Sequence, residues 1–292
     1  MRIGAVFPQT EIGDDPAVIR AWAETVEEIG YKHILAFDHV VGAGTDTRQG
    51  WRGYTSEEAF HEVFVLFGYL AAVTSAVELV TGVLILPQRQ TVLVAKQAAE
   101  VDVLSGGRLR LGVGVGWNPV EYEALGESFS NRGVRSEEQI ELLRALWAEP
   151  KITFSGRWHR VDNAGIKPLP VRRGMPIWIG GGAEATLRRI ARMGDGWFPQ
   201  RPPDEVARGA LDRLRAYAVE AGREPAEIGV EPRLTLAGVP ESERAGFVSG
   251  WRDLGATHLC VNTMGLGLAG PADHLAVLKE TFEAMEPIAN GR

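Results

Sequence analysis

The side chain best suited to acid–base chemistry is His39, which follows Asp38 directly after an apolar run that begins at Ile34. The run is typical of a buried strand, so these two polar side chains emerge where the strand ends. An imidazole can accept or supply a proton at neutral pH. We therefore predict that His39 is catalytic. The alternative is a structural histidine that is hydrogen-bonded to a loop.

A second candidate is the triple glycine Gly180-Gly181-Gly182, which follows an apolar run and precedes a helical pattern that starts near Glu184. Glycines let backbone N–H groups approach a ligand closely, and the N-terminus of a helix favours an anion. The pattern predicts a site for a phosphate group. A tight turn that binds no ligand is the alternative.

A third candidate is the glycine-rich segment 112–118, which ends in Trp117 and Asn118. Its glycines alternate, so they share one face of a strand, and they lack the Gly-x-Gly-x-x-Gly spacing of a dinucleotide-binding turn. We interpret that face as open space for a flat ligand. Gly114, Gly116, Trp117 and Asn118 are the expected contacts.

Several other classes of function are disfavoured by the sequence. No His-x-His pair or His/Asp cluster indicates a metal centre, and no Gly-x-Ser-x-Gly elbow indicates a serine hydrolase. The formal charge of −7 argues against nucleic acid and anionic membranes as partners. With Cys260 as its one cysteine and no long apolar run, the chain is expected to be a cytoplasmic protein with no bound metal.

The elements that must position these residues alternate between short apolar runs and helical patterns. The expected strands are 2–6, 33–37, 78–86, 108–115, 177–180, 196–198, 228–236 and 258–261. Eight such units predict a single (β/α)₈ TIM barrel over residues 1–292. Residues 127–175 interrupt the rhythm with one helix, 136–147, and an irregular stretch, which we interpret as an insertion after the fourth strand. A doubly wound open sheet is the alternative fold.

In a barrel, working residues lie after the carboxyl ends of the strands, where the candidates above are found. Seven segments in this order resemble the luciferase-like monooxygenase superfamily, and most closely its actinobacterial branch assigned to coenzyme F420. They are ILAFDHV (34–40), TGVLILPQ (81–88), AKQAA (95–99), LSGGRL (104–109), GVGVGWN (112–118), IGGG (179–182) and GDGW (194–197).

The resemblance implies that an isoalloxazine-like ring lies in the barrel mouth, with His39 transferring a proton beside it and with Asp38 nearby. It maps the family's strand-three bulge, which backs the ring, to Gly82-Val83, and implies a cis peptide bond there. It maps the phosphate loop to residues 180–182. One position departs from the pattern, because some F420 dehydrogenases of the superfamily have a glutamate where this chain has Trp117.

The function implied is hydride transfer between F420 and a small organic substrate. One alternative is an FMN-dependent monooxygenase that needs a flavin reductase as partner, and another is a flavin-binding protein without activity. We also expect a homodimer. Substrate specificity should lie in the loop 41–54 and in the insertion.

Overall fold

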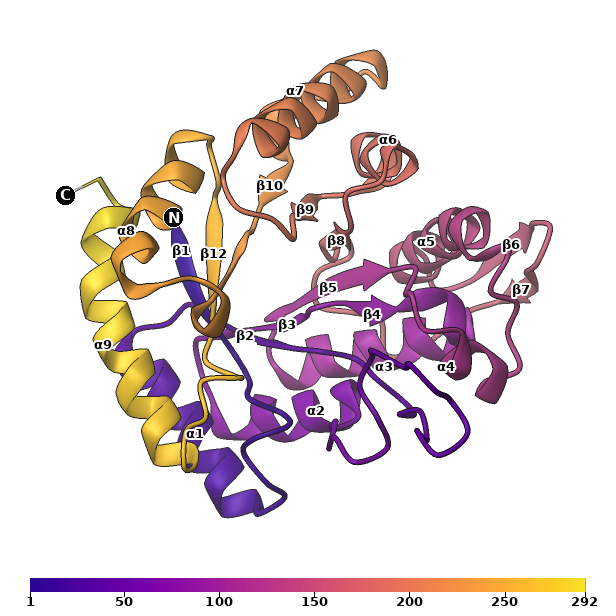
Figure 1. Ribbon diagram of the computed structural model, residues 1–292. Coiled ribbons are helices and arrows are strands. Elements are labelled where there is room, and N and C mark those ends of the chain that lie inside the picture. The colour runs from indigo at the N-terminus through magenta and orange to yellow at the C-terminus, as the bar shows by residue number, and fades with distance from the viewer. Residues whose placement is uncertain (292) are drawn as a thin grey trace.

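A strongly curled parallel sheet forms the centre of the fold (Figure 1). The structure is a computed structural model and describes residues 1–291. Neighbouring strands follow the order β10-β9-β8-β5-β3-β2-β1-β12-β11, and β4 pairs with β5. The strands of this sheet are β1 (Arg2–Val6), β2 (His33–Ala36), β3 (Glu78–Thr81), β4 (Leu84–Ile85), β5 (Leu109–Gly114), β8 (Ile177–Gly180), β9 (Gly196–Phe198), β10 (Gly229–Val230), β11 (Arg233–Thr235) and β12 (His258–Asn262).

The first and last strands of this order, β10 and β11, are consecutive in the chain. Only Glu231 and Pro232 separate β10 from β11. The N–H of Glu231 donates to the carbonyl of Trp197 (2.9 Å), and the carbonyl of Pro232 accepts from the N–H of Cys260 (3.0 Å). The segment 228–236, which was expected to be one strand, therefore contacts both edges of the curled sheet.

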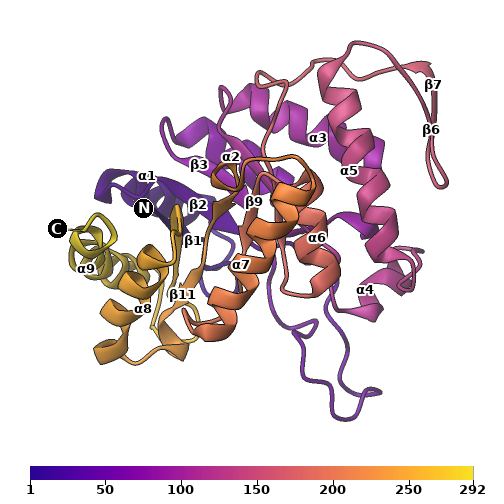
Figure 2. The same ribbon diagram turned by 90° about the horizontal axis from the view of Figure 1, so that it is seen from above.

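Helices surround the outer side of the sheet (Figures 1 and 2). In residues 1–291, none of them combines the length and the apolar character that a membrane span requires. The α-helices are α1 (Pro16–Ile29), α2 (Val63–Val73), α3 (Thr91–Leu104), α4 (Pro119–Ala124), α5 (Arg132–Ala148), α6 (Glu184–Met193), α7 (Glu205–Glu220), α8 (Glu241–Asp253) and α9 (Pro271–Ala289). Short 3₁₀ turns are η1 (Leu86–Gln88), η2 (Pro225–Glu227) and η3 (Leu236–Gly238).

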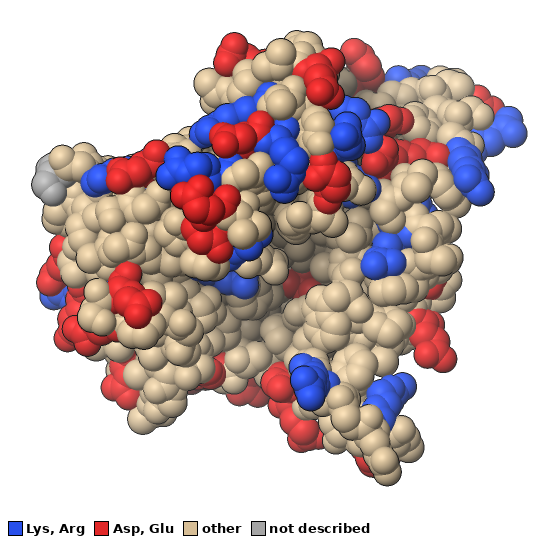
Figure 3. Space-filling view, turned by 45° about the horizontal axis from the view of Figure 1, so that its top comes forward, with Lys and Arg blue, Asp and Glu red and all other residues tan. Residues whose placement is uncertain are grey.

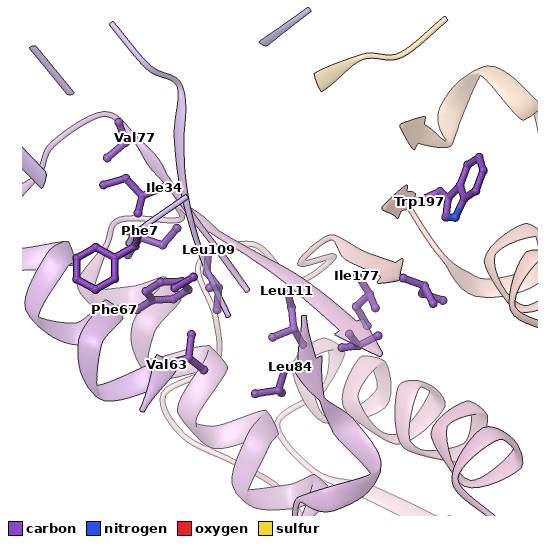
Figure 4. Close-up of a cluster of buried hydrophobic side chains, with 14 of the residues drawn as sticks. Phe7, Ile34, Val63, Phe67, Val77, Leu84, Leu109, Leu111, Ile177 and Trp197 are labelled. Atoms are coloured by element: carbon purple, nitrogen blue, oxygen red, sulfur yellow. The ribbon is translucent and has the colours of Figure 1, made fainter. Parts of the chain in front are cut away.

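The alternation of side chains along the strands divides the core into two clusters. On the outer face, Ile34, Leu109 and Leu111 pack with Val63 and Phe67 of α2 (Figure 4). A second, smaller cluster lies on the inner face of the sheet. It consists of Val6, Leu35, Val80, Trp178, Phe198 and Cys260, with Phe37, Val83 and Met264 packed against it. The inside of the curled sheet is therefore filled with side chains, as in a barrel.

Most helix boundaries follow the capping residues seen in the sequence. Asp15 accepts a hydrogen bond from the N–H of Ala17 at the start of α1, and Gly30 ends α1 in the left-handed conformation (φ 112°). The sequence pattern predicts a second helix from about Glu57 to Thr74, and the start of this prediction is wrong. Glu62 caps α2 by accepting from the N–H of Val65 (2.8 Å), so the helix begins six residues later.

The stretch interpreted as irregular contains an antiparallel hairpin, β6 (Ile152–Ser155) and β7 (Arg160–Ala164), which projects from the edge of the molecule (Figure 2). The carboxylate of Glu138 on α5 accepts hydrogen bonds from the N–H groups of residues 157, 158 and 159. It also contacts the ring of His159 at 2.8 Å. One partly buried acceptor thus orients the turn of the hairpin, which a pattern of apolar residues could not indicate.

Candidate functional site

The predicted site residues gather where the strands end at one edge of the curled sheet. Residues 37–40 follow β2, residues 116–118 follow β5 and residues 180–182 end β8. Parallel strands present their carboxyl ends on the same side, which brings these segments together. We call this region the mouth. The face drawn in Figure 3 is hollowed near its centre, with acidic and basic side chains interspersed around the hollow.

His39 lies at the mouth among aromatic side chains. Its ring is 3.8 Å from the ring centroid of Tyr54 and 4.7 Å from that of Phe60. About a fifth of the side chain is exposed (19%), and its Nδ1 lies 3.6 Å from Oε1 of Glu121. That distance is an ion-pair contact, longer than a hydrogen bond. Within residues 1–291, Nδ1 has no hydrogen-bond partner. The imidazole is therefore held by stacking and remains available for a proton.

The carboxylate beside His39 belongs to Glu121, which is 1% exposed and lies in the first turn of α4. Oε1 accepts from the N–H of Val40 (2.7 Å), and Oε2 accepts from Nε2 of Gln88 (3.3 Å). Burial favours the neutral acid, but the contact with His39 and the hydrogen bonds from Tyr54 and Val40 outweigh it and lower the pKa of Glu121. An ionised carboxylate therefore lies next to the imidazole. Asn118-Pro119 is an N-cap and N1 pattern that predicts the start of this helix, but no spacing rule links the side chain of Glu121 to His39.

Trp117 and Asn118 lie at the mouth as predicted, next to the loop 41–54. Nδ2 of Asn118 donates to the hydroxyl of Tyr54 (2.8 Å) while its Oδ1 caps α4. Trp117 is 52% exposed and packs edge-on against Tyr54 and beside Trp51. Burial, together with the nearby carboxylate of Glu121, raises the pKa of Tyr54, which stays a neutral phenol. These rings form an apolar wall beside His39.

The structure corrects the prediction that Asp38 contacts a cofactor. Its side chain is buried (2% exposed) and accepts from the N–H of Ile85 (3.0 Å). It also pairs with the guanidinium of Arg89 at 2.5 Å. Burial raises the pKa of Asp38 against the opposing effect of Arg89. Adjacent side chains of an extended chain point apart. His39 therefore faces the mouth, whereas Asp38 faces inward and fixes the segment after β4.

The peptide bond between Gly82 and Val83 is cis, as predicted. It separates β3 from β4, which together form the strand expected at 78–86. The side chain of Val83 fits beside two glycines of the neighbouring strands. A Cβ at Gly114 would lie 2.5 Å from Cγ2 of Val83, and a Cβ at Gly180 would lie 3.0 Å from its Cγ1. Val83 thus packs at the mouth between β5 and β8.

The expectation that the glycines of residues 112–116 leave open space for a flat ligand is wrong. A Cβ at Gly112 would lie 2.0 Å from the carbonyl oxygen of Thr81, and one at Gly116 would lie 2.7 Å from Cγ2 of Ile85. Val83 lies against Gly114 in the same way. Thr81, Val83 and Ile85 therefore fill the space beside the glycines at 112, 114 and 116. The glycines accommodate the protein's own chain, so any contact of Gly114 or Gly116 with a cofactor must come from their backbone.

The backbone of residues 180–182 fits an anion better than it fits a plain turn. Gly181 has a φ of 119°, and its carbonyl accepts from Nε1 of Trp197 (2.7 Å), which fixes the loop against β9. The N–H groups of Gly181, Gly182 and Ala183 donate to no backbone acceptor of residues 1–291. A Cβ at Gly182 would meet nothing within 4 Å. Free N–H groups in open space before α6 are the donors that a phosphate group requires.

Charged groups also fill the inner face of the sheet beneath the mouth. Glu231 (1% exposed) accepts from Nη1 of Arg110 at 2.5 Å and contacts Nε2 of His33 at 2.7 Å. The charge of Arg110 and the contact with His33 outweigh the effect of burial and lower the pKa of Glu231. His33, Glu231 and Cys260 place potential metal ligands within 4.8 Å of one another. The guanidinium of Arg110 already neutralises Glu231, so this cluster suits an ion-pair network better than a metal.

The arrangement provides two of the parts that a flavin-type cofactor requires. The loop 180–182 offers N–H donors for a phosphate, and the imidazole of His39 with the carboxylate of Glu121 offers a route for a proton. Val83, which packs beside Gly180, and Phe198 offer apolar surface that suits a planar ring.

Comparison with known proteins finds relatives along most of the chain. The family model described as luciferase-like monooxygenase matches residues 1–246. The chain is 39% identical over 186 residues to an uncharacterised protein of Mycobacterium tuberculosis, which covers 63% of this chain and 64% of that relative. It is 34% identical over 248 residues to an FMNH2-dependent dimethylsulfone monooxygenase of Pseudomonas fluorescens, which covers 82% of this chain and 66% of the relative. The chain thus spans about two thirds of these relatives' length.

Solved structures share the fold along almost the whole chain. An F420-dependent secondary alcohol dehydrogenase in complex with an F420–acetone adduct has a TM-score of 0.80 and 16% identity, and covers 99% of this chain and 98% of its own. A monooxygenase from Streptomyces bottropensis has a TM-score of 0.76 and 21% identity, and covers 98% of both chains. At these identities the likeness shows a common fold and no more.

Proposed function

This chain belongs to the luciferase-like monooxygenase family, and we propose that it is an oxidoreductase that transfers a hydride between coenzyme F420 and a small organic substrate. The observation that carries the proposal is the pairing of His39 with the buried, ionised Glu121 at the mouth. Hydride transfer to or from a substrate carbon is usually accompanied by proton transfer, which needs such an acid–base group. When bound, the deazaflavin ring of F420 supplies or accepts the hydride.

In this proposal each segment of the mouth has a separate task. The N–H groups of residues 181–183 bind the cofactor phosphate, and the cis peptide Gly82-Val83 backs its ring. His39 holds or moves the proton at Nδ1, and Glu121 keeps the imidazole in position. Trp117 and Tyr54 exclude water from one side of the site.

The second candidate is an FMN-dependent monooxygenase that receives reduced flavin from a reductase. Its support is the dimethylsulfone monooxygenase, which is 34% identical over 82% of this chain. Both cofactors carry a tricyclic ring and a phosphate, so the donors at the mouth accommodate either one. A flavin-binding protein without activity is the third candidate, and the position of His39 beside the ionised Glu121 at the mouth favours an enzyme over it.

Titration of the full chain with F420 and with FMN, followed by cofactor fluorescence, tests the proposal. We expect tighter binding of F420. Tight binding of FMN alone would move the assignment to the monooxygenase, and binding of neither would refute both. Gly182→Asp should weaken binding at least tenfold, because it places a carboxylate where the phosphate binds and its Cβ meets no other atom. Gly174→Asp, in equally open space away from the mouth, is the control.

We further infer that the curled sheet is the predicted (β/α)₈ barrel, closed through Glu231-Pro232. Treating β3 with β4 and β10 with β11 as single strands gives eight strands, each followed by an α-helix. In this interpretation α5, which lies against α3, is the barrel's fourth helix. The insertion then shrinks from residues 127–175 to the hairpin segment 149–175.

A homodimer is also proposed. Exposed apolar side chains occur on α2 and α3, where Val65 is 74% exposed, Leu93 51% and Leu104 58%. A second copy covering these helices would remove that surface from water. Light scattering on the purified chain at micromolar concentration should give twice the mass of the chain.

A further inference from the structure

A guanidinium without a partner lies at the mouth, at the start of β11. Within residues 1–291, the side chain of Arg233 makes no ion pair and no hydrogen bond. Its Cζ lies 4.9 Å from the ring centroid of Phe37, which follows β2 two residues before His39. Burial removes water from the cation and lowers the pKa of Arg233. A mostly desolvated charge without a counter-ion is costly unless something binds to it.

The nearest carboxylate on the inner face does not neutralise Arg233. Glu231 is two residues away, but its two oxygens are engaged by His33 (2.7 Å) and Arg110 (2.5 Å). The side chain of Arg233 instead borders two spaces at once. One is the narrow crevice beside Gly82, Val83 and Phe198, and the other is a cavity of about 660 Å³.

This cavity offers polar donors around the cation. Gln200 and Thr235 line it, and Arg201 adds a second guanidinium that lies 3.5 Å from Asp204. Glu243 is the one acidic residue that lines it, and its side chain is exposed. Phe247 and Val239 complete the wall with apolar surface. The volume is sufficient for a small organic molecule with one charged group.

We propose that this cavity binds the substrate of the proposed reaction, and that the substrate is a small organic anion whose carboxylate, sulfonate or phosphate group pairs with Arg233. The inference rests on the proposed function, because it places the substrate beside Gly82-Val83, the segment proposed to back the cofactor ring. The planar guanidinium suits the two oxygens of such a group. The uncharged part of the substrate would then extend along Phe37 toward His39.

The test measures binding of three probes, benzoate, benzenesulfonate and phenyl phosphate, by calorimetry on the full chain. Benzyl alcohol serves as the neutral control of the same size. We expect the anions to bind at least tenfold more tightly than the alcohol. Arg233→Gln should weaken anion binding about 10–100-fold, Arg233→Lys should retain part of it, and Arg208→Gln should leave it unchanged. Arg208 is an exposed arginine of α7 that lies outside the cavity and pairs with Glu205.

Two further measurements separate this site from the cofactor site. The N–H groups of residues 181–183 can also bind anions, so the titrations are repeated in Gly182→Asp, where binding of benzoate should persist. Cofactor affinity is measured in Arg233→Gln and should stay within about twofold of the unmodified chain.

Equal affinity for anions and alcohol would overturn the proposal, as would anion binding that is lost in Gly182→Asp and kept in Arg233→Gln. Loss of cofactor affinity in Arg233→Gln without any anion binding would assign Arg233 to the cofactor and overturn it as well. Anion binding at Arg233 in a chain that binds neither F420 nor FMN would support this site and refute the proposed function.

Discussion

Glu121→Gln tests whether the buried carboxylate beside His39 supports the chemistry. Glutamine keeps the volume of the side chain and can still accept from the N–H of Val40, so α4 and the segment after β2 should remain in place. What disappears is the negative charge 3.6 Å from Nδ1 of His39. One of the two carboxylate oxygens also becomes an amide nitrogen that cannot accept from Nε2 of Gln88.

The magnitude follows from the contacts that the charge makes. Hydrogen bonds to an ionised group contribute about 1.5–3 kcal/mol each. In the transition state His39 gains a proton, and Glu121→Gln removes one interaction of this size with the charged imidazole. Each 1.36 kcal/mol is a factor of ten in rate, so turnover should fall about 10–100-fold. Cofactor affinity should change less than threefold, because Glu121 is shielded from the mouth by His39 and Tyr54.

The assay is single-turnover reduction of the bound cofactor, with cofactor binding and thermal unfolding measured on the same samples. Glu123→Gln is the matched control, because it makes the same change on the exposed side of α4. If Glu121→Gln turns over within twofold of Glu123→Gln while both remain folded, Glu121 does not act through His39. If cofactor affinity falls as much as turnover, it is a binding residue and the reasoning is refuted.

Three other changes test separate parts of the structure. His39→Ala should keep the fold and most cofactor affinity but lower turnover about 10²–10⁴-fold, and a loss confined to binding would make His39 a cofactor contact only. Glu231→Gln removes the nearer carboxylate of the buried Arg110 and leaves it only Glu78 at 3.4 Å, so chemical denaturation should show a loss of about 3–5 kcal/mol; a loss under 1 kcal/mol would contradict the network. Glu27 accepts from the N–H groups of Ala76 and Val77 and from Ser75, and against the effect of burial these bonds lower its pKa to about 2. Because the folded-state pKa is depressed, Glu27→Gln should cost about 1–2 kcal/mol near pH 7, and the difference from the unmodified chain should shrink as the pH falls from about 4.5 toward 2. A difference that is constant with pH would exclude this origin.

The order of strands and helices could be predicted because it rests on local signals. Apolar runs, the Asp15-Pro16 and Asn118-Pro119 starts and the terminating Gly30 each act within one turn of chain. The hairpin at 152–164 escaped prediction because its turn is fixed by Glu138, on another element. The start of α2 was misplaced for a similar reason, since a glutamate is an uncommon capping residue.

The site was predictable only in part. His39 and residues 180–182 lie at the mouth because the carboxyl ends of parallel strands meet there, which is a rule of topology. The partnership of His39 with Glu121 joins residues 82 positions apart, and the inward turn of Asp38 depends on Arg89, 51 positions away. The unpaired state of Arg233 is likewise visible only when its surroundings are known. Contacts of this kind leave no periodic trace in a single sequence.

The close fit between the glycines at 112–116 and residues 81–85 also limits which substitutions the family can accept. Gly114 faces the side chain of Val83, so an alanine at Gly114 becomes acceptable when Val83 is shortened. These two positions should therefore change together among related sequences. Gly112 has no such freedom, because the atom facing it is the backbone oxygen of Thr81, which no substitution removes. Gly116 has none either, because its φ of 64° is a conformation that residues with a side chain rarely adopt. An evolutionary record or a mutational library should show one exchangeable pair beside two invariant glycines.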